Sequence, residues 1–563
     1  MLTAEPKAYG SNWYAATRVE SPARPRLTVE LDVDVCVIGA GLAGLTAARE
    51  VARLGWSVVV LEAQSIAWSA SGRNTGVVLP GFGIGAGALI ERVGLDQAKA
   101  LWARSAAGAE YVRNDARNMP GAALSESGWL HVSKTDDARA MAHEAALVAG
   151  EFRGLVEPWP ADRVREALQS PRYFHGLHYL QGFCLHPLNY ALGLAAAAEA
   201  AGARIFEDTP VLEIDPAGVR KRVITQHSRV RAAHLVLAGN VHMTELVPQF
   251  ADTLLPIFST TIITAPLGDE LHHAVRYPGA VGDGDPAGQH HRIVDGERLM
   301  WSGQSTVWLG KPQRHADALI RKIRRTYPAL RGLKAEHAWI GVTGHTVHGM
   351  PQIGEVAPGL WLLNGFGGHG LNTTAMAGEM VAHAIVEGDR TWEMFSPFAL
   401  VWAGGAFGRA AQQVSDWSRR AHETWDGMLA RGRGGKRRLA EGPKPGVVSP
   451  HPIPDVPPPI EPVAEPPMQP VAVVAPPAAA VVPKSTPEIP EGQSGAAAPP
   501  IPDAPVVSAV VKRPKRGPKK KKAATLRGLS EQLIEREKAP ADPAVLGDAP
   551  DGPERPPLPD EKT

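Results

Sequence analysis

The stretch Asp34-Val35-Cys36-Val37-Ile38-Gly39-Ala40-Gly41-Leu42-Ala43-Gly44 decides the fold of this chain, together with the residues that follow it up to Glu62. Residues 35–38 are apolar and mostly β-branched, which predicts a strand buried on both faces. Residues 45–54 favour a helix with one apolar face, and residues 57–61 predict a second strand. The segment is therefore expected to fold as strand, glycine turn, helix and strand.

The glycines of this turn predict a binding site for a dinucleotide. Gly39 permits the tight turn, Gly41 lets backbone N–H groups approach a pyrophosphate, and Gly44 lets the helix pack closely onto the strand. The helix N-terminus adds a partial positive charge that favours phosphate. Glu62 ends the second strand, where an acid is expected to bind a ribose hydroxyl. The alternative is a tight turn in an α/β domain without a ligand, which has no need for this acid.

Charge, cysteine content and hydropathy exclude several classes of protein. The net charge of +1 predicts no general attraction to nucleic acid or membrane. Cys36 and Cys184 are too few for a disulfide framework and indicate a reducing compartment. No apolar run is long enough to span a membrane, and the first residues lack the features of a secretory signal. We therefore expect a cytoplasmic protein.

The composition also separates a folded part from a tail. Residues 441–563 contain 30 of the 51 prolines and no Phe, Trp or Tyr. Because such a segment cannot bury enough apolar surface to offset the entropy of ordering, we expect a disordered tail from residue 436 to residue 563. Its basic run, residues 512–522, would bind polyanions weakly and without specificity, or else be merely solvated.

Two more segments indicate contact with a flat ligand. Residues 67–76 are mostly small, with one arginine and one asparagine, which is typical of a backbone laid against a ligand; the alternative is a surface loop with one exposed cation. Residues 360–364 predict a strand that runs into the glycine turn Gly365-Phe366-Gly367-Gly368-His369-Gly370. A helix over residues 371–387 follows, so a second helix N-terminus is expected to point at a site.

With these segments the chain resembles the FAD-dependent oxidoreductases of the D-amino-acid oxidase superfamily over about residues 10–395. The resemblance rests on the two glycine turns, the helix with Pro187 and Tyr190, the turn Ala238-Gly239-Asn240, and Pro351-Gln352-Ile353-Gly354. The loop Ser71-Gly72-Arg73-Asn74 and the aromatic arm Trp13-Tyr14 are most similar to the branch that contains gamma-glutamylputrescine oxidase. The resemblance implies oxidation of the C–N bond of a small amine or amino acid, with hydride transfer to flavin N5 and imine hydrolysis.

The implied fold class is α/β, with a discontinuous Rossmann-like FAD-binding domain and an α+β substrate domain built on an antiparallel sheet. We expect an N-terminal arm packed on the domain surface over residues 1–29, and a helical extension over residues 396–435. The FAD-binding domain is predicted over residues 30–120, 183–253 and 337–395. The substrate domain is predicted over residues 121–182 and 254–336.

The resemblance also assigns site residues. The residues implied in FAD binding are Gly39, Gly41, Leu42, Ala43, Gly44, Glu62, Ala63, Ser71, Gly72, Arg73, Asn74, Val211, Ala238, Gly239, Gly367, Gly368, His369, Gly370 and Leu371. Among these, the start of the second helix would face the flavin N1/O2 edge, where reduced flavin is negative. We expect Glu50, on the first helix, to lie on the surface.

His369, Arg73 and Asn372 are the candidate catalytic residues over the flavin ring. His369 would keep the amine neutral or bond the flavin, and the alternative is a histidine that merely packs in the turn. Arg73 would pair with a substrate carboxylate or with its own domain. The run His290-His291-Arg292 would contact an anionic substrate. No metal is expected, because the pair His345 and His348 has no supporting acid or cysteine nearby in sequence.

Departures from relatives qualify the resemblance. Some relatives tether flavin to a cysteine in the segment that corresponds to residues 341–345, or to a histidine in the segment that corresponds to residues 65–76; this chain has neither, so FAD is expected to be noncovalent. Sarcosine oxidases use a lysine to activate oxygen, and Lys311 is the nearest candidate by sequence. The electron acceptor therefore stays open between oxygen and a partner protein. A scaffold protein that acts through its basic tail is the alternative function.

Overall fold

The computed structural model describes residues 9–10, 12–283, 289–308, 312–405 and 408–411. The chain divides into two compact units, residues 1–442 and 443–563, and every described residue belongs to the first. The predicted disordered tail, its basic run, Lys311 and most of the predicted helical extension therefore lie outside the described residues. Among the described helices, none combines the length and the apolar character that a membrane crossing requires.

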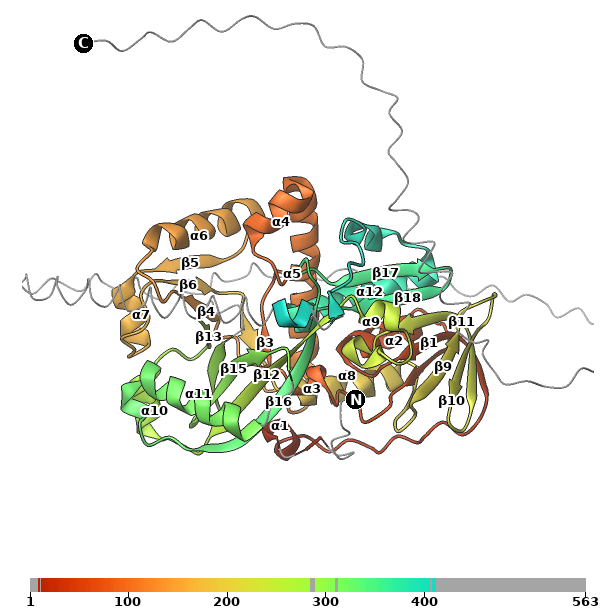
Figure 1. Cartoon of the computed structure of the whole chain (residues 1–563), viewed down its shortest axis with the longest axis horizontal. Coiled ribbons are helices and arrows are strands. Elements are labelled where there is room, and N and C mark those ends of the chain that lie inside the picture. Colours follow the sequence, from red (N-terminus) through yellow and green to blue (C-terminus); the bar gives the residue numbers. More distant parts are fainter. Residues whose placement is uncertain (1–8, 11, 284–288, 309–311, 406–407, 412–563) are drawn as a thin grey trace, which may run out of the picture. The chain divides into compact units, whose positions relative to one another are not determined.

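The first of two large sheets contains the strand that precedes the first glycine turn (Figure 1). Its strands are β1 (Leu31–Ile38), β2 (Val58–Leu61), β8 (Arg204–Phe206), β9 (Val211–Asp215), β10 (Lys221–Thr225), β11 (Arg229–Leu237), β17 (Gln352–Ala357) and β18 (Leu360–Asn364). The strand order is β17-β18-β11-β1-β2-β8, and off this path β10 pairs with β11 and β9 pairs with β10. Strands β18, β11, β1, β2 and β8 run parallel. β1 and β18 therefore end at the same edge of the sheet.

The second sheet is mostly antiparallel. Its strands are β4 (Trp129–Val132), β5 (Val156–Trp159), β6 (Gly176–Tyr179), β12 (Leu255–Thr264), β13 (Ala280–Gly282), β14 (His290–Val294), β15 (Arg298–Thr306) and β16 (Ala335–His345). The order is β16-β12-β15-β14-β13-β4-β6-β5, and only β13 and β4 pair in parallel. β16 pairs with β12 from residue 335 to residue 345, so the predicted boundary at residue 336 falls inside this strand. That pairing joins segments about 80 residues apart, which a local pattern does not reveal.

The helices and short strands complete the described part. The α-helices are α1 (Trp13–Ala16), α2 (Leu42–Arg53), α3 (Ala70–Arg73), α4 (Ala86–Val93), α5 (Leu95–Asn118), α6 (Ala138–Phe152), α7 (Ala161–Ala167), α8 (Pro187–Ala200), α9 (Pro248–Ala251), α10 (Asp269–Ala274), α11 (Pro312–Thr326) and α12 (Gly370–Glu387). The 3₁₀ helices are η1 (Asn240–Met243), η2 (Pro328–Leu330), η3 (Gly367–His369) and η4 (Thr391–Phe395). Two short strands, β3 (Val77–Val78) and β7 (Phe183–Cys184), pair with each other.

Two glycine contacts hold the helices α2, α12 and α5 together. A Cβ on Gly378 of α12 would lie 2.6 Å from Thr46 Cβ of α2. A Cβ on Gly108 of α5 would lie 2.3 Å from the carbonyl oxygen of Asn372 on α12. Since real Cβ contacts are longer than this, glycine is what allows the close approach. The start of α12 is thereby held in a defined place.

Helix α2 carries a buried ion-pair network, which corrects the expectation that Glu50 lies on the surface. Glu50 is only 6% exposed, although the sequence pattern predicts a surface position. Its carboxylate pairs with Arg49 at 3.0 Å and accepts a hydrogen bond from the Tyr111 hydroxyl of α5. The prediction is wrong because α5 packs over this face of α2, a contact that the local sequence does not reveal.

One residue of the N-terminal arm, Tyr14, is buried more deeply than in an arm that only covers the surface. Tyr14 is 1% exposed, its hydroxyl donates to Met300 Sδ of β15 at 3.3 Å, and its ring packs on His186 beside α8. Tyr14 therefore connects strand β15 of the second sheet with the start of helix α8.

Candidate active site

The first glycine turn can be built only with glycine at two positions. Gly39 has φ +108°, and a Cβ there would lie 2.8 Å from the carbonyl oxygen of Ala238, in the turn after β11. A Cβ on Gly44 would lie 2.1 Å from the carbonyl oxygen of Gly39. These contacts hold α2 tightly against the ends of β1 and β11, the two neighbouring strands where ligands bind in open α/β sheets.

The N-terminus of α2 is partly capped and partly open. The N–H of Leu42 donates to Ser71 Oγ at 3.0 Å, which fixes the helix start to α3. The first hydrogen bond within the helix runs from the N–H of Leu45 to the carbonyl of Gly41, so the N–H groups of Ala43 and Gly44 have no partner inside it. Such N–H groups, together with the helix dipole, bind anions.

Glu62 holds the same turn from the other side. Its Oε2 accepts the N–H of Ala40 and its Oε1 accepts the N–H of Gln64, each at 2.8 Å. Burial raises the pKa of the Glu62 carboxyl, while these two N–H groups lower it. The carbonyl of Glu62 accepts the N–H of Thr209, and β9 begins at Val211, two residues further on. The structure thus places Glu62 and Val211 near each other beside the turn, with exposed Ala63 next to them.

The Ser71–Asn74 loop is ordered by its own side chains. Asn74 donates to the carbonyls of Ala70 and Ser71 and accepts the N–H of Gly76 at 2.8 Å. A Cβ on Gly72 would lie 2.4 Å from the Ala67 carbonyl oxygen. The loop is therefore preformed.

Arg73 is buried and binds backbone carbonyls rather than facing solvent. It is 8% exposed and donates to Trp68 at 2.9 Å, Ile340 at 3.3 Å and Tyr9 at 3.4 Å. Its own carbonyl accepts the indole N–H of Trp339 at 3.0 Å. Arg73 thus joins the loop to β16 and to the N-terminal arm, which is the role of a positioning residue.

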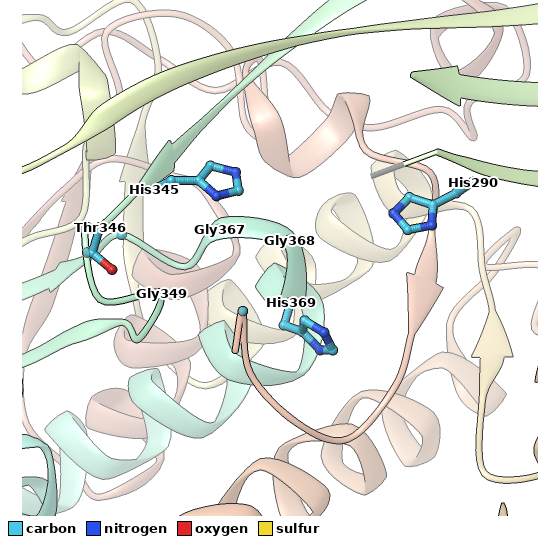
Figure 2. Close-up of a pocket in the computed structure, with 9 residues that line it drawn as sticks. His290, His345, Thr346, Gly349, Gly367, Gly368 and His369 are labelled. Atoms are coloured by element: carbon cyan, nitrogen blue, oxygen red, sulfur yellow. The ribbon is translucent and has the colours of Figure 1, made fainter. Parts of the chain in front are cut away.

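The second glycine turn opens onto a cavity of about 210 Å³. The cavity is lined by Gly83, His290, His345, Thr346, Gly349, Gly365, Gly367, Gly368 and His369. A Cβ on Gly368 or on Gly370 would meet no atom within 4 Å. No side chain caps the start of α12. The start of α12 therefore leaves room for a ligand, and Figure 2 shows the His345 and His290 rings pointing toward each other across this space.

His369 and Asn372 have different surroundings. Burial lowers the pKa of the His369 imidazole, and the backbone carbonyl of Leu79, with which the ring forms a hydrogen bond, opposes that shift. One ring N–H therefore donates to the Leu79 carbonyl, and the other ring nitrogen is an acceptor. Asn372 is 1% exposed and donates to the carbonyls of Gly81 at 3.1 Å and Ser105 at 3.5 Å. Asn372 holds the loop that carries Leu79 and Gly81.

The structure separates the run His290-His291-Arg292. His290 lines the cavity, whereas His291 stacks on Trp301 at 4.2 Å in the core behind the sheet and contacts the Tyr327 hydroxyl. Burial lowers the pKa of His291 to about 3. Arg292 donates to the carbonyls of Thr75 and Leu185. Strand alternation explains this separation, because neighbouring side chains point to opposite faces.

Sequence reasoning did not place Gly83, Thr346 or Gly349 at the site. They lie in loops far apart in the chain, and a Cβ on Gly83 would be 2.6 Å from the Gly349 carbonyl oxygen. No local signal marks such a contact. His345 and His348 take separate partners, Thr343 Oγ1 and the Ala399 carbonyl respectively. Among the described residues, no group of three or more His, Cys, Asp or Glu side chains is arranged to hold a metal ion.

Comparison with known proteins shows to which family the chain belongs. The family model described as DAO, FAD dependent oxidoreductase, matches residues 34–384. The chain belongs to this family. The predicted resemblance to the D-amino-acid oxidase superfamily and the predicted FAD cofactor are thereby confirmed.

Individual relatives agree with the family assignment. The chain is 30% identical over 395 residues to a probable oxidoreductase OrdL of Haemophilus influenzae, covering 68% of this chain and 90% of the relative. It is 29% identical over 395 residues to the gamma-glutamylputrescine oxidoreductase of Escherichia coli, covering 69% and 91%. The crystal structure of glycine oxidase from Geobacillus kaustophilus superposes with a TM-score of 0.55 at 19% identity, covering 66% of this chain and 99% of that one. The predicted fold class is confirmed by this likeness.

The residues present fit FAD. The turns before α2 and α12 follow parallel strands of one sheet and so lie at one edge, where a dinucleotide can extend from one helix start to the other. The first turn presents N–H groups for a pyrophosphate, and the second has open space at Gly368 and Gly370 for a flat ring. The site therefore has an anion-binding end and a ring-binding end.

Proposed function

We propose that the chain oxidises the C–N bond of a small amine or amino acid, which would lie beside the flavin ring at the cavity that His369 and the start of α12 line. The observation that carries this proposal is the pairing of an open helix N-terminus with the imidazole of His369 on one cavity wall. FAD, when bound, accepts a hydride from the carbon next to the amine nitrogen. All other tasks fall to the chain itself.

His369 is the group that keeps the amine neutral. Aliphatic amines are mostly protonated at neutral pH, and a protonated amine has no lone pair to help the hydride leave. Burial lowers the pKa of His369, so its ring is neutral at pH 7 and one nitrogen is unprotonated, and the lowered pKa also makes this nitrogen a weaker base than a free imidazole. The hydrogen bond to Leu79 fixes which nitrogen is free to accept a proton. Loss of the proton and then of the hydride leaves a protonated imine, which water hydrolyses to a carbonyl compound and ammonia or an amine.

The α12 N-terminus stabilises negative charge. No side chain caps it, and its first N–H groups have no partners within the helix. Such preorganised donors lower the cost of charge that develops during the reaction. Asn372 and Arg73 act by positioning: Asn372 holds the Gly81 loop beside His369, and Arg73 holds the Ser71–Asn74 loop against β16.

The substrate we favour is a gamma-glutamylputrescine-like amine, with sarcosine-like compounds and D-amino acids as the alternatives. This choice is supported by similarity to the Escherichia coli gamma-glutamylputrescine oxidoreductase across most of both chains. It also agrees with the neutral and polar character of the cavity lining named above.

An anaerobic absorbance screen tests the proposal. The purified full-length protein with FAD is mixed with putrescine, gamma-glutamylputrescine, sarcosine, glycine and D-alanine, with a buffer blank as control. Bleaching of the oxidised flavin band by at least one amine is expected. If no amine bleaches the flavin, the proposal is wrong. Adding oxygen or an artificial dye afterwards shows whether the enzyme is an oxidase or a dehydrogenase.

A further inference from the structure

Two buried polar atoms near the first glycine turn have no hydrogen-bond partner among the described residues. They are the indole nitrogen of Trp68 and the side-chain oxygen Oδ1 of Asn240. A buried polar group without a partner costs free energy, so such groups are rare unless a ligand, an ion or a water molecule satisfies them. The indole N–H is a donor and the amide oxygen is an acceptor. The two atoms together therefore indicate a bound group that both accepts and donates hydrogen bonds.

Trp68 is fixed next to the first glycine turn. The N–H of the residue before it, Ala67, donates to the carbonyl of Ala40 at 2.9 Å. The guanidinium of Arg73 lies over the Trp68 ring, 5.0 Å from its centroid, and the His242 ring packs against it edge to face at 6.1 Å. These contacts hold the ring in place, but none of them uses the indole N–H. The N–H is therefore available to a ligand that lies along the turn.

Asn240 follows β11 in a backbone conformation that is uncommon for residues other than glycine. Its φ is +51°, in the left-handed region, and such residues cluster at sites where ligands bind. A Cβ on Gly344 of β16 would lie 2.2 Å from the amide oxygen of Asn240, so a glycine there makes room for this side chain. The Ala238 carbonyl of the same turn lies against Gly39, where a Cβ would be 2.8 Å away. The amide of Asn240 is thus held close to the first glycine turn.

The strand order places Asn240 between the two glycine turns. β11 lies between β1 and β18, and because the three strands run parallel, their ends share one edge of the sheet. The turn after β1 presents N–H groups that suit a pyrophosphate, and the turn after β18 has open space for a flat ring. In FAD a ribityl chain with three hydroxyl groups joins the pyrophosphate to the flavin ring. The end of β11 is therefore where this chain passes when FAD extends from one turn to the other.

We infer that Trp68 and Asn240 bind the ribityl chain of FAD, with the indole N–H donating to one hydroxyl group and the amide oxygen accepting from one. A hydroxyl group is both a donor and an acceptor, so the ribityl chain satisfies both buried atoms. A pyrophosphate offers only acceptors and would leave the amide oxygen of Asn240 without a partner. The inference concerns the cofactor and holds for any amine substrate.

The test measures how fast FAD leaves the flavin-loaded full chain, by timed ultrafiltration into flavin-free buffer. Trp68→Phe keeps a ring beside Arg73 and removes the N–H, and Asn240→Gly tolerates the left-handed φ and removes the amide. Each variant is expected to release FAD about three- to tenfold faster than wild type, the range for one hydrogen bond. The controls are Trp402→Phe, at a residue that is 64% exposed, and Asp295→Gly, at an exposed residue with φ +49°. Both should release FAD as wild type does.

Two further measurements separate the ribityl chain from the rest of FAD. ADP has the adenine, ribose and pyrophosphate without the ribityl chain, so it should bind FAD-free Trp68→Phe and Asn240→Gly as tightly as wild type. An FAD analogue that lacks a contacted ribityl hydroxyl should bind wild type about three- to tenfold more weakly than FAD does.

Three results would overturn the inference. The first is release of FAD at the wild-type rate by both variants, and the second is an equal loss of affinity for ADP and FAD. The third is full affinity of wild type for every analogue that lacks one ribityl hydroxyl, which would assign the two contacts to the flavin ring. The melting temperature of FAD-free Trp68→Phe is expected to match that of wild type, and a lower value would show that the indole N–H is bonded within the protein. Because no amine is oxidised in these measurements, their failure leaves the proposed function intact.

Discussion

The two glycine turns of the first sheet are built differently, although each joins a parallel strand to the N-terminus of a helix. The turn before α2 is closed by its surroundings: Glu62 accepts two of its nearby N–H groups, Ser71 caps the helix, and Cβ atoms at Gly39 or Gly44 would clash with backbone. The turn before α12 has no side-chain cap and open space at Gly368 and Gly370.

We propose that the first turn holds the cofactor and that the second turn takes part in the reaction. The closed turn leaves little freedom to the backbone, and in our proposal it fixes the position of the pyrophosphate. The open turn leaves space at the start of α12 beside His369, where we propose that the reaction takes place. Mutations in the first turn should therefore change stability and cofactor retention, and mutations in the second should change the rate.

The largest effect on stability is expected when Gly44 of the first turn is replaced by alanine, and the same change at Gly368 of the second turn is the comparison. Gly44→Ala should destabilise the protein by about 3 kcal/mol or more and lower its FAD content, because the new Cβ would lie 2.1 Å from the Gly39 carbonyl oxygen. Gly368→Ala is the matched change in the open turn and should leave the unfolding free energy nearly unchanged. Denaturant titration of both variants measures this. Equal stability losses would remove the distinction between the turns.

The next effect concerns His369 and is kinetic. His369→Gln should slow flavin reduction at saturating amine by about a hundredfold or more, because the proton acceptor is lost. Since the pKa of His369 lies below the ordinary value of about 6.5, the wild-type limiting rate should stay level above that pH and fall as the pH drops through the lowered pKa. Anaerobic stopped-flow reduction across pH measures both. A variant with the wild-type rate and pH profile would show that His369 only packs.

The next prediction concerns Glu62 and the affinity of the protein for FAD. Glu62→Ala should weaken FAD binding by about ten- to a hundredfold, because two backbone N–H groups lose their acceptor and the predicted contact with the ribose is lost. Titration of the apoprotein with FAD, followed by flavin fluorescence, measures this. Glu91→Ala, at an exposed position of α4, is the control, since Glu50 is buried in an ion-pair network. Equal affinities in the two variants would contradict the role of Glu62.

The smallest effect is expected at the cap of α2. Ser71→Ala removes the acceptor for the Leu42 N–H and should cost about 1 kcal/mol of unfolding free energy, as helix caps do. Ser69→Ala, which removes only an exposed contact with His242, should cost less. A larger loss at Ser69 than at Ser71 would show that the α2 start does not depend on this cap.

Local sequence was enough to predict the two turns and the elements around them. Glycines at Gly39, Gly41 and Gly44 between an apolar strand and a helix leave few other conformations, because φ/ψ freedom and close packing are properties of neighbouring residues. The acid at Glu62 and the second turn follow from equally short patterns. The resemblance that rests on these residues was enough to predict FAD and the family. That FAD binds without a covalent bond to the protein stays a prediction, which the release of FAD on denaturation checks.

Long-range packing decided the rest of the site. His290 reaches the cavity because β13 pairs with β4 and makes room for Trp129, residues separated by about 150 positions. Arg73 binds the Ile340 carbonyl 267 residues away, so its positioning role depends on where β16 lies. Burial of Glu50 likewise depends on α5. The sequence determines which short segments form turns, strands and helices, whereas the tertiary structure decides which distant side chains share a cavity, because those contacts depend on how sheets and helices pack.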